Sequence, residues 1–221
     1  TGSSYGLGNI YYEFGRKDPF PGTKGKFLNS TSGYSSGSSQ SLYATVGATS
    51  TFANAVQNPM TYYYVSSSNW CSEYTETAYL WNDKNISNTS TDDSYGDKSI
   101  FDPSPLGWKL PVTGIWSNFS NTTGRDSSLS SSQYYFPYFP WYDSSSVAQG
   151  RIYGGFAYFP ASGYRISSSG GLGNGGSYGY GWSAAPGSTT YGYSLYFNST
   201  YVYPANYSSR ASGFPARPIQ E

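Results

Sequence analysis

The stretch SYGYGWSAAPGSTTYGYSLYFNSTYVYPANYSSR, residues 177–210, is the most informative part of this chain. It holds eight of the 26 tyrosines, set among Gly, Ser, Thr and Asn, with a single charged residue, Arg210, at its end. Tyrosine combines a wide apolar ring with a hydroxyl that donates and accepts hydrogen bonds, so Tyr/Ser/Gly/Asn mixtures suit contact surfaces. The stretch predicts a binding surface; the alternative is that a chain poor in aliphatic residues builds its core from tyrosine.

Strand alternation separates inward from outward tyrosines in this stretch. Leu195 and Phe197 require burial, so Tyr193 joins them on one face and Tyr196 takes the other. The same argument buries Val202 and exposes the tyrosines on either side of it. The predicted ligand contacts are Tyr178, Tyr180, Tyr191, Tyr196, Tyr201, Tyr203 and Tyr207. The predicted core residues are Trp182, Leu195, Phe197, Phe214 and Ile219.

Composition indicates a single domain over residues 1–221 with an aromatic core. Net charge is zero and aromatic residues make up 20% of the chain, so buried rings supply area that aliphatic residues otherwise provide. No Lys/Arg cluster favours nucleic acid, and no apolar run approaches the ~20 residues of a membrane span. Low charge with abundant Ser, Thr, Asn and Gly is typical of extracellular β-rich proteins. The start at Thr1 favours a mature product or the C-terminal domain of a longer protein.

The chain has no histidine and one cysteine, Cys71, which argues against enzymatic chemistry. Serine- or cysteine-histidine catalysis and the usual zinc sites lose their central residue, and Cys71 is expected to be buried or idle. A glycosidase with two carboxylates is the rival hypothesis, but the 12 Asp and Glu form no convincing constellation. We predict no catalytic residue, no metal and no cofactor; Asn82 and Asp83 are a weaker candidate for calcium.

The predicted fold class is α+β, with twisted antiparallel sheets, two short helices and long loops. Residues 9–14 read as a strand, and residues 51–58 as a helix capped by Ser50 or Thr51 and stopped by Pro59. A second brief helix follows Thr113, with Ile115, Trp116 and Phe119 available for burial. Residues 29–41 and 84–99 read as loops. From residue 134 onward, short aromatic runs alternate with turn residues, which predicts a meander of short strands.

Several segments resemble a known family: GRKDPFPG (15–22), LWNDK (80–84), IFDPSPLGWKLP (100–111), FPASGYR (159–165) and GWSAAP with GFPARPI (181–219). In this order they resemble the C-type-lectin-like domain that ends many surface and fimbria-associated proteins of gut Bacteroidetes, related to the Fibrobacter major paralogous domain. That superfamily includes variable proteins of diversity-generating retroelements and phage receptor-binding proteins. The chain departs from the family at Ser104, where cysteine is common, and at Ile115, where an acidic residue is common.

The resemblance implies a ligand-binding, adhesin-type domain whose Tyr/Ser/Asn-rich outer sheet face contacts a protein or glycan on another cell or host surface. It implies display on a cell surface or fimbria tip, or on a phage virion, behind an N-terminal domain or fibre. The alternative is a structural fibre or virion component whose tyrosines pack on sister subunits. Neither function involves nucleic acid or insertion into a membrane.

Overall fold

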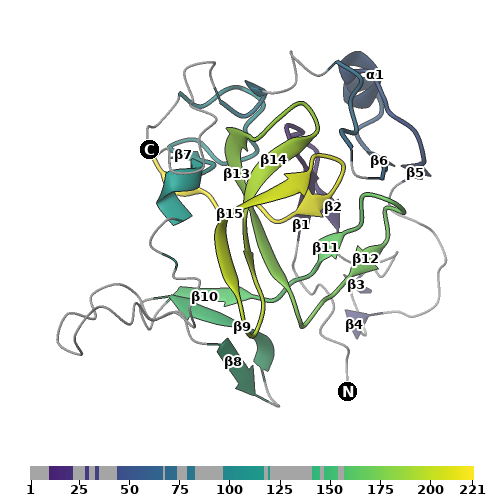
Figure 1. Cartoon of the computed structure of the whole chain (residues 1–221). Helices are drawn as coiled ribbons and strands as arrows, with labels where there is room; N and C mark the ends of the chain where they lie inside the picture. Colours follow the sequence, from purple (N-terminus) through teal and green to yellow (C-terminus); the bar gives the residue numbers. More distant parts are fainter. Residues whose placement is uncertain are drawn as a thin grey trace.

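The computed structural model describes residues 10–21, 28–29, 33–34, 44–66, 68–73, 79–82, 97–116, 119, 141–144, 147–153 and 157–221. Antiparallel strands dominate this part of the chain, which also holds the short helix α1 (Phe52–Gln57) and the 3-10 turn η2 (Thr113–Trp116) (Figure 1). The prediction of antiparallel sheets with little helix is confirmed for these residues. The helix content of these residues is smaller than the predicted α+β class implies.

The tyrosine-rich stretch forms the central sheet of the molecule. Its three antiparallel strands are β13 (Gly179–Pro186), β14 (Tyr191–Phe197) and β15 (Val202–Ser209), in that order across the sheet. Figure 1 shows them in green and yellow at the centre of the molecule. The strands that precede them along the chain, β8 (Trp141–Ser144), β9 (Val147–Tyr153) and β10 (Ala157–Pro160), form a separate sheet. The predicted meander is therefore present but divided among several sheets.

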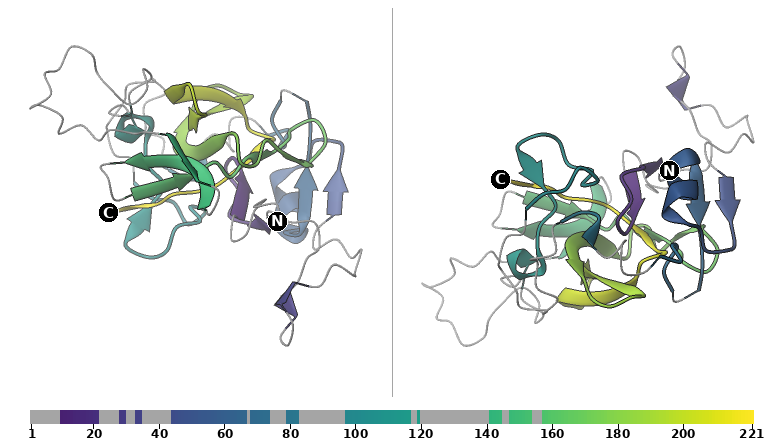
Figure 2. Two further views of the ribbon diagram at one scale, coloured as in Figure 1. Left: turned by 90° about the horizontal axis from the view of Figure 1, so that it is seen from below. Right: turned by 90° about the horizontal axis from the view of Figure 1, so that it is seen from above.

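Short strands from distant parts of the chain complete the fold. A five-stranded sheet has the order β12 (Leu172–Gly173), β11 (Tyr164–Arg165), β16 (Gly213–Phe214), β1 (Ile10–Glu13) and β2 (Phe20–Pro21). Three strand pairs are β7 (Trp108–Lys109) with β17 (Ile219–Gln220), β3 (Leu28–Asn29) with β4 (Gly33–Tyr34), and β5 (Ala44–Val46) with β6 (Thr61–Tyr63). In both views of Figure 2, α1 with β5 and β6 lies on the opposite side of the molecule from β8–β10.

The predicted first helix is confirmed as α1 (Phe52–Gln57). The Thr51 side chain caps its start by accepting a hydrogen bond from the Asn54 amide, and the helix ends at Asn58 before Pro59. Its inward residue is Ala55, whereas Phe52 is half-buried and Val56 is exposed. A helix this short is stabilised by its cap and by tertiary packing rather than by its own propensity.

The second predicted helix is a single 3-10 turn, η2 (Thr113–Trp116). Trp116 and Phe119 are buried as expected, and they pack with Phe159, Leu195 and Phe197 beneath one face of the central sheet. The indole nitrogen of Trp116 donates to the Ser183 hydroxyl at 3.1 Å. This face of the sheet is therefore closed by the core.

Three tryptophans link β1 and the residues just after it to the rest of the core. The indole nitrogens of Trp182, Trp70 and Trp81 donate to backbone carbonyls at successive alternate positions, those of Tyr12, Phe14 and Arg16. These bonds satisfy the one polar atom of each indole, which allows all three rings to be buried. Tyrosine also contributes to the core, because Tyr11, Tyr62, Tyr63 and Tyr193 are buried, so the alternative role for tyrosine holds in part.

Two further predictions need correction. Ile219 was expected in the core, but it is half-buried at the edge strand β17, where it pairs with Lys109. Residues 29–41 were expected to be a loop, yet Asn29 and Gly33 belong to the short pair β3–β4. Within the predicted loop 84–99 the structure describes only residues 97–99, where Lys98 pairs with Asn82. Residues 134–140, Asp83 and the first residue of the predicted strand at 9–14 lie outside the described residues.

Candidate ligand-binding surface

Four tyrosines form a row of neighbouring rings on the face of the central sheet opposite η2. We call Tyr180, Tyr196, Tyr203 and Tyr201 the tyrosine ladder. The strand register places Tyr180 opposite Tyr196, and Tyr196 opposite Tyr203. The ring centroids lie 4.9 Å apart in the first pair, 5.7 Å in the second, and 5.9 Å between Tyr203 and Tyr201. Ring planes differ by 32°, 7° and 30°, so the ladder is a run of roughly parallel rings.

The ladder begins in the core and ends in solvent. The Tyr180 ring stacks on Phe214 at 4.3 Å, and Phe214 lies 4.3 Å from Trp182, which is 0% exposed. Exposure rises along the row, through half-buried Tyr180 and Tyr196 to 43% at Tyr203 and 50% at Tyr201. Each outer ring therefore rests on one that is more buried, which fixes its rotamer before any ligand binds.

The sheet face around the ladder carries two more tyrosines. Tyr178, a predicted contact, meets the edge of Tyr196 at 5.5 Å, and it is half-buried. Tyr164 of β11, which sequence reasoning did not single out, packs 5.1 Å from Tyr180. The structure thus brings five of the seven predicted contacts together and adds Tyr164 beside them.

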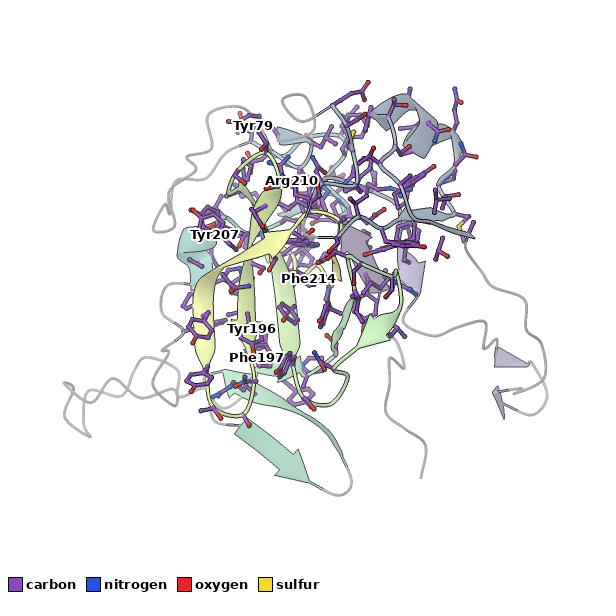
Figure 3. All side chains as sticks on the ribbon, turned by 45° about the vertical axis from the view of Figure 1, so that its right-hand side comes forward. Tyr79, Tyr196, Phe197, Tyr207, Arg210 and Phe214 are labelled. Atoms are coloured by element: carbon purple, nitrogen blue, oxygen red, sulfur yellow. The ribbon has the colours of Figure 1, made fainter. Side chains whose placement is uncertain are left out.

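The remaining two predicted contacts lie farther along the sheet, near its other end. Tyr207 is 55% exposed and its ring lies 4.7 Å from buried Tyr193, with the two hydroxyl oxygens 2.6 Å apart. Half-buried Tyr191 meets Tyr207 edge-on at 6.5 Å. Figure 3 labels Tyr196 low on the sheet and Tyr207 higher, toward Arg210. Tyr191 and Tyr207 therefore form a separate group around Tyr193 and not part of the ladder.

The alternation argument is confirmed at its main positions. Tyr193, Leu195, Phe197 and Val202 are buried, while Tyr201 and Tyr203 on either side of Val202 are exposed. Tyr193 nevertheless packs in a different cluster from Leu195 and Phe197, with Phe14 and Trp182 among its members. A register shift between Ser194 and Tyr196 in the β14–β15 pairing separates the two halves of the strand.

The hydroxyls of Tyr180 and Tyr196 remain protonated at neutral pH, because the pKa of each is raised. Burial raises the pKa of Tyr180, and the neighbouring hydroxyls of Tyr196, Tyr164 and Tyr178 add to the effect. Burial and the adjacent Tyr178 also raise the pKa of Tyr196, partly offset by a hydrogen bond from Asn198. Tyr180 and Tyr196 therefore present neutral hydroxyls that can donate as well as accept hydrogen bonds.

The chain segment that forms the sheet of the ladder contains no Asp, Glu, Lys, Arg or His. This absence extends over all residues between Arg165 and Arg210, although charged residues make up 11% of the protein. The two flanking arginines are buried, and both guanidinium groups donate to backbone carbonyls: Arg165 to Gly170, and Arg210 to Ser188 and Tyr191. The strands β13, β14 and β15 are consequently polar through hydroxyl and amide groups alone.

A buried arginine holds the turn that carries the outer end of the ladder. Arg151 of β9 donates from Nε and Nη2 to the Asn198 carbonyl oxygen, at 2.9 and 2.6 Å. The Asn198 side chain in turn accepts from the amides of Thr200 and Tyr201 and donates to the Tyr196 hydroxyl. Burial lowers the pKa of Arg151 to about 10, well above neutrality, so the guanidinium stays charged. The turn between β14 and β15 is thereby fixed to the neighbouring sheet.

Arg151→Met is expected to loosen this turn while leaving the rest of the sheet in place. Hydrogen bonds to a charged group contribute about 1.5–3 kcal/mol, and the variant loses both bonds to Asn198. Amide hydrogen exchange at Thr200 and Tyr201 should accelerate, as measured by mass spectrometry or NMR. The matched control is Arg217→Met, which removes an exposed arginine bonded to the Tyr158 carbonyl and should leave exchange at the turn unchanged. Equal exchange in both variants would contradict the role of Arg151.

Among the side chains singled out in the sequence, Cys71 and Asn82 belong to the described residues. No group of three or more His, Cys, Asp or Glu side chains that could hold a metal ion occurs among them. Cys71 is buried, as predicted, with its sulfur 3.8 Å from a Glu73 carboxylate oxygen. Asn82 is buried too, while its partner in the proposed calcium site, Asp83, lies outside the described part of the chain. In the described part, no helix is long and apolar enough to cross a membrane.

Comparison of the chain with protein-family models, with curated proteins and with solved structures finds no match. The candidate site consequently rests on its own geometry. Of the residues that build it, Arg151 and Tyr164 were missed at the sequence level. Arg151 follows a glycine in an aromatic run, and nothing in its local sequence indicates a contact with a turn 47 residues away.

Proposed function

We propose that this protein is a non-enzymatic ligand-binding domain of the adhesin type, which contacts a protein or glycan through the tyrosine ladder. We propose further that its fold is C-type-lectin-like and that it acts outside the cell, on a cell surface, a fimbria tip or a phage virion. The predominance of antiparallel sheet supports this assignment without distinguishing it from other β-rich folds.

The observation that carries the proposal is the continuous stack from Trp182 to Tyr201. A tyrosine that only fills a core has no need of an exposed ring, and an isolated surface tyrosine has no support from its neighbours. Here exposure grows while each ring keeps a partner within 6 Å of its own centroid. Aromatic side chains held in place in this way lose little entropy on binding and act as interface anchors.

Alanine replacement of outer and inner tyrosines tests the proposal. Tyr201→Ala and Tyr203→Ala should change the free energy of unfolding by no more than about 0.5 kcal/mol, as at ordinary surface positions. At least one of them should weaken binding by about 1 kcal/mol or more, as expected for an aromatic anchor. Tyr193→Ala should do the opposite, because it removes a buried ring and lowers the melting temperature. Binding is measured by flow cytometry of the labelled domain on a panel of intact bacterial and epithelial cells.

The same variants separate ligand binding from the structural alternative. If the tyrosines pack on sister subunits, the wild-type domain should self-associate in analytical ultracentrifugation and Tyr201→Ala should be monomeric. A monomer at all concentrations, with cell binding that depends on Tyr201 or Tyr203, supports the adhesin-type function. Unaltered cell binding in both variants would rule out the ladder as the binding surface.

A further inference from the structure

We propose that the tyrosine ladder takes an uncharged saccharide, and that it does so without calcium and without ion pairs. This inference rests on the proposed ligand-binding function and narrows its ligand to one chemical class. Three features of the ladder carry it: the absence of charge, the sideways offset of the outer rings, and the hydroxyls that surround them.

The lack of charged residues on the ladder strands favours an uncharged partner. A carboxylated or sulfated glycan binds through guanidinium or ammonium groups, most often in bidentate geometry. The arginines nearest the ladder along the chain, Arg165 and Arg210, are buried and point at backbone carbonyls, and Arg151 donates to Asn198. Since residues 166–209 contain no Asp, Glu, Lys, Arg or His, the ladder strands supply no countercharge for an ionic ligand.

The outer half of the ladder leaves ring faces uncovered. Carbon atoms in contact lie about 3.5–4.0 Å apart, so near-parallel rings with centroids 5.7 Å apart must be displaced sideways. Tyr196, Tyr203 and Tyr201 therefore descend as steps, each exposing part of a ring face. The inner pair differs, because Tyr180 and Phe214 lie only 4.3 Å apart and cover each other. Stepped aromatic faces suit the C–H faces of sugar rings, which are flat, weakly polar and uncharged.

Hydroxyl and amide groups border these faces. The turn that joins β14 to β15 exposes Ser199 and Thr200 next to Tyr201, and each ladder ring carries its own hydroxyl. Such groups both donate and accept, and this matches saccharide hydroxyls, which do the same. The turn is already fixed by Arg151 and Asn198, so ordering it costs little on binding.

A protein partner is the competing occupant of this surface, because tyrosine is enriched in protein interfaces too. Charged groups on a protein-binding face steer the partner and reject wrong ones, and arginine is enriched in protein interfaces. The ladder strands provide neither. We therefore expect a saccharide ligand, and the experiment below distinguishes it from a protein ligand.

The experiment uses a printed array of neutral oligosaccharides with their sialylated and sulfated counterparts, probed with the labelled domain. We expect binding to one or more neutral members, unchanged by EDTA and by high sodium chloride. Tyr201→Ala or Tyr203→Ala should reduce the apparent affinity at least about fivefold. Thr189→Ala, an exposed hydroxyl change in the turn at the opposite end of the sheet, is the matched control and should bind normally.

Two further measurements make every outcome decisive. The neutral-saccharide inference is overturned by any of three results: binding only to acidic members of the array, loss of binding in EDTA, or an array without tyrosine-dependent signal. Cells that bind the domain are then treated with periodate or with protease. Binding that survives periodate and is lost to protease identifies a protein ligand, which rejects this inference and retains the proposed function. Absence of tyrosine-dependent binding to any cell rejects both.

Discussion

Replacing Arg16 by alanine is expected to lower the free energy of unfolding by about 3–5 kcal/mol, the usual cost of breaking a buried ion pair by removing one partner. The Arg16 side chain is 2% exposed. Its guanidinium donates hydrogen bonds to the carboxylates of Glu13 and Asp18 and to the backbone carbonyls of Pro59 and Thr61. It also lies over the aromatic rings of Phe20, Tyr63 and Trp70. One side chain thus ties β1 and the turn after it to β6 and to Trp70.

The variant also removes the Arg16 guanidinium from buried Glu13, with the Tyr63 amide still donating to the Glu13 carboxyl. Burial raises the pKa of Glu13 to about 8 while Arg16 opposes the rise, so loss of Arg16 raises this pKa further. A raised carboxyl pKa contributes stability that is present below the unfolded value of 4.5 and is lost as the pH rises through the folded value. Wild type and variant lose this stability equally up to the wild-type pKa and differ only above it, so the destabilisation by Arg16→Ala should be smaller at about pH 6 than at about pH 9.

Urea denaturation at both pH values measures these effects. Lys17→Ala is the matched control, because the neighbouring cation is exposed and bonds only the Ile100 carbonyl among the contacts seen. It should change stability by no more than about 0.5 kcal/mol. Equal losses in Arg16→Ala and Lys17→Ala would show that the buried network contributes nothing specific, and a larger loss at the lower pH would reverse the assignment of charge at Glu13.

Local patterns predicted the parts of this fold that depend on neighbours in sequence. Thr51 caps α1 because a threonine side chain reaches the amide three residues ahead, and Pro59 follows the helix end. The alternation of β14 and β15 buried Leu195 and Val202 and exposed Tyr203, since side chains on a strand alternate between two faces. These rules need no knowledge of distant segments.

Contacts between distant segments could not be predicted in this way. Ile219 follows a hydrophobic pattern, but β17 pairs at a sheet edge, and an edge residue is covered on one side only. Tyr191 and Tyr207 match the ladder tyrosines in type and spacing. They nevertheless lie beyond the register shift in β14–β15, and Tyr207 packs on the ring of Tyr193 instead of on a ladder ring. The division of one tyrosine-rich stretch into two surfaces is a tertiary effect.

Phe214→Ala is expected to cost about 3–5 kcal/mol of stability, as for other buried phenylalanines, and to disorder the tyrosine ladder as well. The Phe214 ring is 2% exposed and lies between Trp182 and Tyr180, at 4.3 Å from each. Its removal leaves a cavity beneath Tyr180, whose ring then loses the support that fixes it. Because Tyr196 rests on Tyr180, and Tyr203 on Tyr196, the effect should extend to the exposed rings.

Phe20→Ala separates loss of stability from loss of the ladder. Phe20 is 0% exposed and packs on Tyr62 and Arg16, on strand β2 at the edge of the five-stranded sheet. Both variants should unfold at lower urea concentration, but only Phe214→Ala should weaken the near-ultraviolet circular dichroism of the coupled tyrosines and reduce binding to cells under conditions where both remain folded. If Phe20→Ala reduced binding and tyrosine dichroism as much as Phe214→Ala, the ladder would not depend on its support from the core. The preorganisation that we assign to the stack would then be wrong, even if Tyr201 and Tyr203 contact the ligand.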